Sequence, residues 1–571
     1  MRRIFFLLIF VTVTLYGKIY PHIHFTGSGV DRFLGDFDES TLLKVIGKPY
    51  PPFYAFWRKD PVFDDREVPE YIERLKRYYR SLGYYRATFT PRFKNDTIEI
   101  EIDKKDPIKV ASLRVEANET IRNLIPFQKG SIFRTDLFKE SKKRIERYLQ
   151  THARPKYRFG AKAYVDLEFY RVDLNYTVIP GPLCKFGKSR IEGGGDVSEK
   201  ILKEQIVYRQ NDPFDLSKIE TTYDNLYNLG VYDYILVEPL LDKNSTQIPV
   251  KIALKMGETR FLQGNVGYGT DEGVHGGISW KDNDFFGNLK QFETGIQAST
   301  LGYSYCARFY NPWLEIPWLG RITFEDRFSL GKRKFESYDE RLIDNRVTLG
   351  KRKFGLEHYF GLLTEISQVK AKTADASIDS GNYFLNALFY RVVIDRRNSI
   401  TNATDGYYLS LYLEKSMPPL GSDLDYLKAL IEARYIKRMG KIIGALKTRI
   451  GMIDQEVPLF KRFYTGGSFT NRGYAYRDLG PKDTKGVPIG GASLVDLLAE
   501  IRYPLSSKFS VVGFYDTSML DTRPQSYNHA FYGSWGFGMR YHTPIGPFRI
   551  DFGFPVRDRG WEFHLNIGQV F

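Results

Sequence analysis

The spacing of hydrophobic and polar positions changes once along the chain, near Arg260. Before that point apolar residues recur at steps of three and four, as in Tyr71, Leu75, Tyr78, Tyr79 and Leu82. This spacing places apolar side chains on one face of a helix. After Arg260 the spacing becomes two for the rest of the chain, which is typical of strands. The pattern therefore predicts an α+β N-terminal part followed by an all-β part.

The N-terminal part repeats three times. Each unit opens with an extended piece and a short helix, and continues with a longer helix and two strands. The longer helices are expected at Val68–Leu82, Asp136–Leu149 and Leu216–Leu229. The strand pairs are expected at 87–93 and 97–102, at 163–169 and 172–179, and at 234–239 and 247–254. We divide this part into units 18–105, 106–181 and 182–259, each of about 80 residues and large enough for a small core.

The C-terminal part, 260–571, alternates in a way that favours a membrane barrel over a soluble sandwich. In the segment 531–541, Phe, Trp, Met and Tyr alternate with Ser, Gly and Arg. Charged residues on the inner face suit a wet lumen, whereas a dry core would leave them unpaired. Only a closed barrel satisfies its backbone polar groups in lipid without helices. At about 19 residues per strand with its turns, we expect about sixteen antiparallel strands.

The first residues have the layout of a secretory signal peptide. Arg2 and Arg3 precede an apolar run from Ile4 to Leu15, and Gly17 is a small residue suited to cleavage. This run is shorter than a membrane-spanning helix needs. We expect residues 1–17 to be a signal peptide.

Composition removes several classes of protein. The chain has 571 residues, two cysteines and a formal net charge of +15. Cys184 and Cys306 are too few for a disulfide scaffold, and the positive charge is spread along the chain rather than gathered in a nucleic-acid-binding block. The aromatic content of 15% matches a barrel with aromatic girdles at both lipid interfaces.

A series of motifs near the C-terminus gives a specific resemblance. It begins with Gly-Gly-Ser-Phe-Thr-Asn-Arg-Gly-Tyr at 466–474 and continues with Gly490-Gly491, Glu500–Pro504, Phe514-Tyr515-Asp516, 536–541, 543–551 and a final segment 563–571 that ends on Phe571. In this order, and after three repeated units, the sequence resembles the outer-membrane assembly superfamily that includes BamA, TamA and the two-partner secretion transporters. Ser518 departs from the family's Phe-x-Asp-x-Gly pattern. The resemblance implies three POTRA-like domains and a surface-antigen barrel.

In that family the loop with the Arg-Gly-Tyr motif folds back into the lumen. The resemblance implies that Arg472 pairs with Asp516 and Glu500, that Gly473 allows a tight turn and that Tyr474 packs against the wall. We call these five residues the loop lock. A planar guanidinium suits this role because it can form a fork of hydrogen bonds to a carboxylate. The alternative is that Arg472 is a solvated loop cation.

A second candidate is a lateral seam between the first barrel strand, about Arg260–Gly269, and the last, Trp561–Phe571. Gly264, Gly267, Gly269 and Gly568 weaken packing there, and with Phe571 they make up the predicted seam. The same glycines are equally well explained as barrel corners.

Other motifs do not support an enzyme, a cofactor or a metal site. Gly187-Lys188-Ser189 resembles the end of a phosphate loop, but Pro182 replaces its first glycine. His22 and His24 have no Cys or carboxylate ligand pattern nearby. Asp282-Asn283-Asp284 is typical of a turn.

The resemblance therefore implies a factor that inserts or folds outer-membrane proteins such as autotransporters, by strand augmentation and lateral opening. Three N-terminal units are most similar to TamA, which implies a TamB-like inner-membrane-anchored partner, nascent outer-membrane substrates and contact with outer-membrane lipid. The expected location is the outer membrane of a Gram-negative bacterium, with the N-terminal domains in the periplasm. The alternatives are a BamA-like general insertase, a passive channel and an enzymatic barrel.

Overall fold

The computed structural model describes residues 18–31, 35–51, 59–242, 244–374, 379–506, 508–527, 530–543, 546–568 and 570–571. The predicted signal peptide, residues 1–17, lies outside the described residues. Across the described ranges, no helix combines the length and the apolar character needed to span a membrane.

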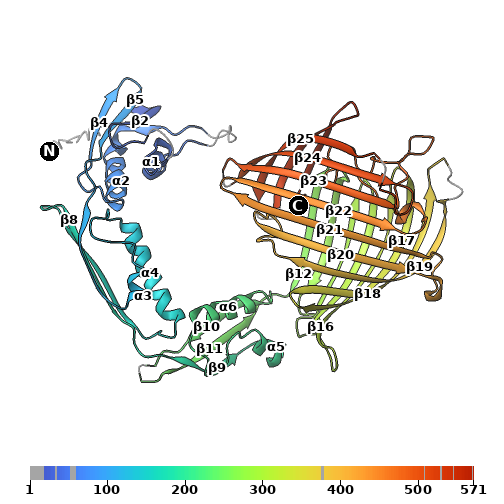
Figure 1. Ribbon diagram of the computed structural model, residues 1–571, viewed down its shortest axis with the longest axis horizontal. Helices are drawn as coiled ribbons and strands as arrows, with labels where there is room; N and C mark the ends of the chain where they lie inside the picture. Colours follow the sequence, from blue (N-terminus) through green and yellow to red (C-terminus); the bar gives the residue numbers. More distant parts are fainter. Residues whose placement is uncertain are drawn as a thin grey trace, which may run out of the picture. The chain divides into compact units, whose positions relative to one another are not determined.

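The first N-terminal domain packs two helices against a three-stranded sheet (Figure 1). Its elements are β1 (Ile19–Tyr20), β2 (His22–Thr26), α1 (Glu39–Ile46), β3 (Phe63–Asp64), η1 (Asp65–Glu67), α2 (Val68–Ser81), β4 (Thr88–Lys94) and β5 (Thr97–Asp103). The sheet order is β2-β5-β4, with β2 parallel and β4 antiparallel to β5. Tyr71, Leu75 and Tyr79 of α2 are buried in the core, as the helical spacing predicts.

The second and third domains repeat this plan. The second contains β6 (Lys109–Glu116), α3 (Glu119–Arg122), α4 (Thr135–Thr151), β7 (Arg158–Asp166) and β8 (Arg171–Ile179), in the sheet order β6-β8-β7. The third contains β9 (Lys185–Glu192), α5 (Glu199–Glu204), α6 (Leu216–Tyr227), β10 (Tyr232–Pro239) and β11 (Gln247–Met256), in the order β10-β11-β9. Each sheet draws its strands from one predicted unit, and the exact boundaries 18–105, 106–181 and 182–259 stay predictions.

The C-terminal part is one antiparallel sheet of sixteen strands that curls into a barrel (Figure 1), as predicted. The strands are β12 (Arg260–Gly269), β13 (Gly273–Asp282), β14 (Gln291–Ser299), β15 (Gly302–Ile316), β16 (Gly320–Lys334), β17 (Tyr338–Lys353), β18 (Leu356–Ala371), β19 (Gly381–Asp395), β20 (Gly406–Ser416), β21 (Tyr426–Met439), β22 (Ile442–Ile453), β23 (Ser493–Pro504), β24 (Phe509–Asp521), β25 (Tyr532–Thr543), β26 (Gly546–Pro555) and β27 (Glu562–Ile567). Each strand pairs with the next one in sequence.

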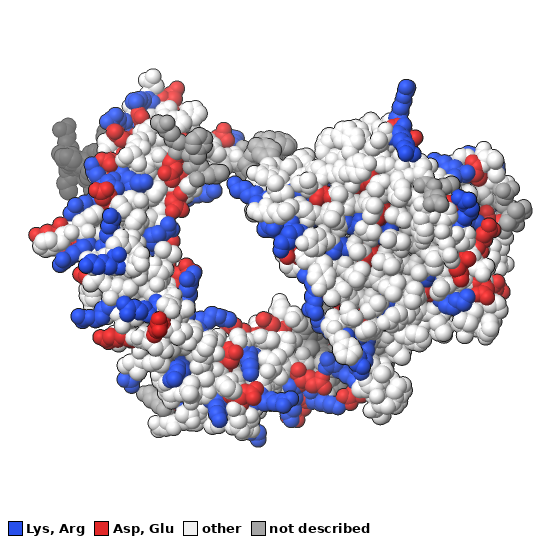
Figure 2. All heavy atoms as spheres, viewed as in Figure 1, with Lys and Arg blue, Asp and Glu red and all other residues white. Residues whose placement is uncertain are grey.

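The two faces of the wall have the chemistry that the alternation predicts. On β25, Trp535 and Phe537 are 52% and 53% exposed, whereas Ser534 and Arg540 are fully buried. Figure 2 shows a broad area of the barrel surface with few charged side chains, and charges gathered mainly toward the strand ends. The apolar face therefore points outward and the polar face points into the lumen.

The barrel wall is not closed by a ladder of hydrogen bonds. β12 and β27 are the two ends of the sheet, and they meet where the Thr270 backbone N–H donates to the Leu565 carbonyl at 3.1 Å. Most of β12 is exposed, including Leu262 and Val266 at 71% and 85%. The boundary between β12 and β27 is therefore a seam with one free edge on each side.

The prediction that the last strand continues to Phe571 is wrong. β27 ends at Ile567, and Gly568 has a φ of +103°, a conformation that only glycine adopts readily. Beyond this turn Val570 and Phe571 are each 1% exposed. They pack in a cluster with apolar residues of β21, β22 and β23 and with Ala403. The chain end is therefore buried inside the barrel instead of extending the seam strand.

Substitution of Leu174 tests the core of the second N-terminal domain. Leu174 lies on β8 and is 1% exposed. We expect Leu174→Ala to lower the free energy of unfolding of this domain by about 2–5 kcal/mol, because it leaves a cavity. Hydrogen exchange of the β8 amides in the full chain measures this change. Leu167→Ala, at a position 55% exposed, is the matched control. Equal protection of β8 in both variants would contradict the assignment of this core.

Candidate functional site

The loop with the Arg-Gly-Tyr motif, residues 454–492, connects β22 to β23 and has a fold of its own. A short 3-10 turn, Leu459–Lys461, begins it. Isolated bridges then join Phe463 to Gly491, Thr465 to Leu479 and Lys482 to Pro488. Lys461 is anchored to inward-facing Glu365 of β18 at 2.7 Å. These contacts fix the loop against the lumen side of the wall.

Arg472 lies at the centre of the loop's contacts and is fully buried. Its Nε and Nη2 donate to the two carboxylate oxygens of Asp516 at 2.8 and 2.9 Å. Its Nη1 donates to Glu500 at 2.6 Å, and its backbone N–H donates to Asp516 at 3.1 Å. The guanidinium carbon lies 3.5 Å from the centre of the Phe514 ring. The structure therefore brings together the three residues predicted to pair, and Arg472 is not a solvated cation.

Three further arginines complete a buried network on the same wall. Arg502 and Arg540 bind Glu500 at 2.7 and 3.1 Å. Arg540 and Arg549 bind Asp551 at 2.6 and 3.2 Å. The side chains of these residues are 0–3% exposed.

This network sets four guanidinium groups against three carboxylates with almost no water to screen them. Removing charges from water is costly, and only close pairing with many hydrogen bonds offsets the cost. Deleting one member leaves a buried charge without its partner, which typically costs about 3–5 kcal/mol. The position of the loop is therefore tied to the position of β23, β24, β25 and β26, which supply the other members.

Gly473 and Tyr474 contact the wall directly. A Cβ on Gly473 would overlap the side chain of Ser534, so the glycine permits close approach. The backbone turns here, because the Tyr474 N–H donates to the Asn471 carbonyl at 3.3 Å. The φ of Gly473 is not positive, so the close approach to Ser534, and not a left-handed conformation, is what requires glycine. The Tyr474 hydroxyl donates to Asp558 at 2.9 Å, and its ring meets the Tyr532 ring edge-on.

Ser468, at the tip of the same loop, contacts both sides of the seam. Its hydroxyl donates to Asp271, in the turn after β12, at 2.6 Å. It also accepts a hydrogen bond from the Asn566 side-chain amide of β27 at 2.7 Å. Burial alone would raise the pKa of the Asp271 carboxyl, but the nearby His564 ring, 3.7 Å away, and the hydrogen bonds from Ser468 lower it overall. Asp271 is therefore a carboxylate at neutral pH, and one serine bridges the two free edges of the sheet.

The predicted seam glycines lie on or beside those edges. A Cβ on Gly269 would meet the Asn566 Oδ1 at 2.8 Å, and one on Gly267 would meet the His275 ring at 2.5 Å. A Cβ on Gly264 would have only a carbonyl oxygen at 3.9 Å. The structure thus brings Gly269 to the seam contact and leaves Gly264 on the free part of β12.

Phe571 and the chain end are held by the lumen wall. The Arg502 guanidinium lies 5.3 Å from the centre of the Phe571 ring. Lys447 Nζ donates to the backbone carbonyls of Val570 and Phe469, both at 3.1 Å. One buried lysine therefore joins the chain end to the loop tip.

Sequence reasoning missed most of this network. The missed residues are Arg502, Arg540, Arg549, Asp551, Asp271, Ser468, Lys447, His564 and Asn566. A usable signal was present for the arginines, because each is a charged residue at an inward position of an alternating strand. No local signal distinguishes Ser468 or Asp271, which meet only in three dimensions.

The remaining candidates have ordinary surroundings. Gly187-Lys188-Ser189 lies within strand β9. His22 and His24 are exposed, and His24 contacts Glu39. Asp282 pairs with Arg260 at 3.0 Å and caps the turn before β14. Within the described residues no group of three or more metal-ligating side chains is present.

Comparison with known proteins agrees with this architecture. The Omp85 superfamily domain matches residues 263–571. The outer membrane protein assembly factor BamA of Nitratidesulfovibrio vulgaris is 23% identical over 472 residues, which cover 77% of this chain and 58% of that protein. BamA of Neisseria meningitidis is 19% identical over 94% of this chain and 77% of that protein. The chain thus spans little more than half the length of the first of these relatives.

Among solved structures, BamA from Haemophilus ducreyi lacking POTRA domains 1–3 aligns with a TM-score of 0.60 and 17% identity, over 81% of this chain and 99% of that one. This similarity supports the fold, in which the N-terminal α/β domains resemble POTRA domains and precede the barrel. The family domain covers more than half of the chain. The protein is an outer-membrane β-barrel protein with N-terminal domains on the periplasmic side, and the chain belongs to the Omp85 superfamily.

Proposed function

We propose that this protein assembles other proteins into the outer membrane by opening its seam and pairing the free edges with an incoming strand. The observation that carries the proposal is the combination of two unpaired sheet ends, β12 and β27, with one loop that ties them together. The activity, substrates and partners below belong to this proposal.

The free edge of β12 supplies the chemistry for strand pairing. An unpaired strand presents backbone N–H and C=O groups that bind another strand with little regard to its sequence. Its exposed apolar side chains, Leu262 and Val266 among them, suit a partner strand that will also face lipid. The edge strands of the three N-terminal sheets offer the same device to a substrate in the periplasm. Folding of the substrate itself supplies the driving force.

The loop lock sets when the seam opens. Arg472 holds the loop in place, and the Ser468 contacts with Asp271 and Asn566 hold the edges near one another. Opening the seam breaks at least one Ser468 contact, whereas the Arg472 network stays on the wall of β23–β26. The loop is thus a fixed support from which one edge detaches.

The finer assignment is a TamA-like factor that acts on substrates such as autotransporters with a TamB-like partner anchored in the inner membrane. The resemblance of the three N-terminal units to TamA supports it. A BamA-like general insertase is the second candidate, and the names of the relatives support it. A passive channel is less well supported because the loop occupies the lumen and three domains precede the barrel. We propose no enzymatic activity.

A disulfide across the seam tests lateral opening. Gly269→Cys with Asn566→Cys, in a chain carrying Cys184→Ser and Cys306→Ser, joins β12 to β27 at the point where a Cβ at position 269 would lie 2.8 Å from the Asn566 side chain. We expect oxidation to reduce folding of an outer-membrane substrate in proteoliposomes to near background, and reductant to restore it.

The control for this cross-link places a disulfide between strands that are already paired. Ala387 and Ser416 are directly opposite each other on β19 and β20. Ala387→Cys with Ser416→Cys in the same background should leave assembly unchanged under both conditions. Full activity of the oxidised seam variant would rule out lateral opening.

Substitution of Arg472 tests the loop lock. Arg472→Ala leaves Glu500 and Asp516 buried without their shared partner, at a cost of about 3–5 kcal/mol. This cost weakens the attachment of the loop to the wall and does not affect the hydrogen bonds between strands. We expect a barrel that still shows the heat-dependent gel shift of a folded barrel but assembles substrate poorly. Arg472→Lys keeps the charge without the fork and should be only partly active.

Lys485→Ala, an exposed position in the same loop, is the matched control and should behave as the parent. If Arg472→Ala assembled substrate as well as the parent, the loop would have no locking role.

Purification of the native complex decides between the two assembly roles. We expect a large inner-membrane-anchored, TamB-like protein to co-purify with the tagged chain from cross-linked membranes. Mass spectrometry identifies the partner, and a tagged barrel without the N-terminal domains serves as the control. Recovery of the lipoproteins of a general insertase in its place would favour the BamA-like role.

A further inference from the structure

A second polar region of the lumen lies away from the loop lock. It is a cavity of about 1000 Å³ on the inner face of the wall from β15 to β21. Its lining holds six arginines and one lysine against four carboxylates, together with several aromatic rings. The cavity therefore carries an excess of positive charge that the assembly proposal does not use.

Three of these arginines form a row across neighbouring strands. Arg308 of β15 is directly opposite Arg327 of β16, and Arg327 is directly opposite Arg346 of β17. Adjacent strands lie about 4.8 Å apart, so the row spans about 10 Å. Like charges in direct cross-strand register destabilise a sheet. The row therefore has an energetic cost in the protein alone.

The acidic residues around the row compensate its charge only in part. Glu325 pairs with Arg308 at 2.8 Å, which leaves Arg327 and Arg346 without an ion pair among the described residues. Asp344 accepts a hydrogen bond from Ser329, and Glu357 accepts one from Tyr359. Glu432 is engaged by Arg434 of its own strand, and Glu293 lies opposite Arg308 at the far end of the row.

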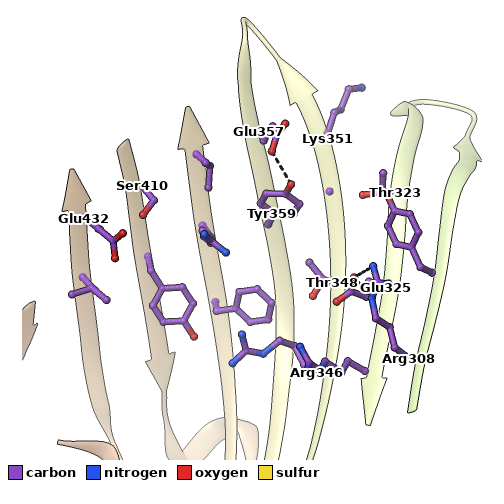
Figure 3. Close-up of a pocket in the computed structure, with 18 of the residues that line it drawn as sticks. Arg308, Thr323, Glu325, Arg346, Thr348, Lys351, Glu357, Tyr359, Ser410 and Glu432 are labelled. Atoms are coloured by element: carbon purple, nitrogen blue, oxygen red, sulfur yellow. Dashed lines mark hydrogen bonds and ion pairs between the residues drawn. The ribbon is translucent and has the colours of Figure 1, made fainter. Parts of the chain in front are cut away.

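Aromatic side chains hold the outer members of the row in place. The Arg308 guanidinium lies 4.9 Å from the centre of the Tyr310 ring, and that of Arg346 lies 5.0 Å from Phe389. Stacking of this kind orients a planar guanidinium. Figure 3 shows Arg308, Glu325 and Arg346 together at one level of the wall, with Glu357 and Tyr359 farther along it. The row is thus oriented before any ligand arrives.

We propose that this row is a binding site for a small ligand that carries two or more phosphate groups. A guanidinium binds phosphate through paired, charge-assisted hydrogen bonds, and three of them across about 10 Å match a ligand with separated phosphates. The cavity volume lies within the usual range of small-molecule sites. Tyr359 and Phe389 supply apolar surface for the uncharged part of the ligand. The ligand offsets the repulsion within the row.

The geometry favours phosphate over an acidic polypeptide. Carboxylates in an extended chain repeat on one face at about 6.6–7 Å, which does not match three cations one strand spacing apart. The source of the phosphate chemistry is either a soluble oligophosphate or the diphosphorylated sugar headgroup of a lipid.

Calorimetric titration of the full chain in detergent tests the site, with tripolyphosphate as the first probe. The second probe is a diphosphorylated sugar lipid in mixed micelles. We expect one saturable site for at least one probe and about tenfold weaker binding for Arg327→Gln and for Arg346→Gln, the loss of one charge-assisted contact. Added salt should weaken binding by the parent.

Arg341→Gln is the matched control. Arg341 lies on β17 like Arg346 and is exposed outside the cavity lining, so its loss removes the same charge without touching the row. It should bind both probes as the parent does. Because Arg327→Gln relieves repulsion, its ligand-free barrel should unfold at the same temperature as the parent or higher, and the probe should no longer raise that temperature.

Each outcome decides the proposal. Binding of tripolyphosphate alone supports a soluble ligand, and binding of the lipid probe supports a headgroup. Absence of binding by either probe overturns the proposal, as does equal weakening in Arg341→Gln. Tighter binding of oligoglutamate than of both phosphate probes would assign the row to an acidic polypeptide and overturn it as well.

Discussion

The buried charge of Arg472 is the constraint on which the arrangement of the C-terminal wall depends. A guanidinium without water is stable only where carboxylates surround it at hydrogen-bond distance. Asp516 comes from β24 and Glu500 from β23, and Glu500 also binds Arg502 and Arg540. A shift of one residue in any of these strands would turn a partner outward. The loop and the strand register therefore stabilise each other.

The same coupling reaches the seam through short links. His564 of β27 contacts the backbone carbonyl of Arg472 at 3.0 Å, and Ser468 joins Asn566 to Asp271. Lys447 joins the loop tip to the chain end. The strands β23–β26 are thus held together firmly, because their buried charges resist separation. By contrast, only a few hydrogen bonds cross the seam. Opening at the seam breaks far less than opening anywhere else.

The sequence was enough to predict the three α/β units, the change of period at Arg260 and the number of strands, because each depends on local alternation. It also placed Arg472 beside Asp516, although this pairing came from a resemblance and not from spacing. The network around Asp551 was missed because its members are distant in sequence and meet only through strand register. Phe571 was misplaced because its alternation continues, while the backbone turns at Gly568 and buries the ring inside.

The two groups of arginines in the lumen differ in how far nearby carboxylates compensate their positive charge. This difference indicates different roles. Around Arg472 each guanidinium has a buried carboxylate partner, so the wall is held together without any ligand. Along Arg308, Arg327 and Arg346 one carboxylate pairs with the first member, and the water-accessible cavity screens the rest. A stabilising role does not explain three neighbouring arginines that repel one another. Serine or threonine at these positions would avoid the cost of that repulsion. The positive charge of the row is better explained by an anionic ligand that binds to it.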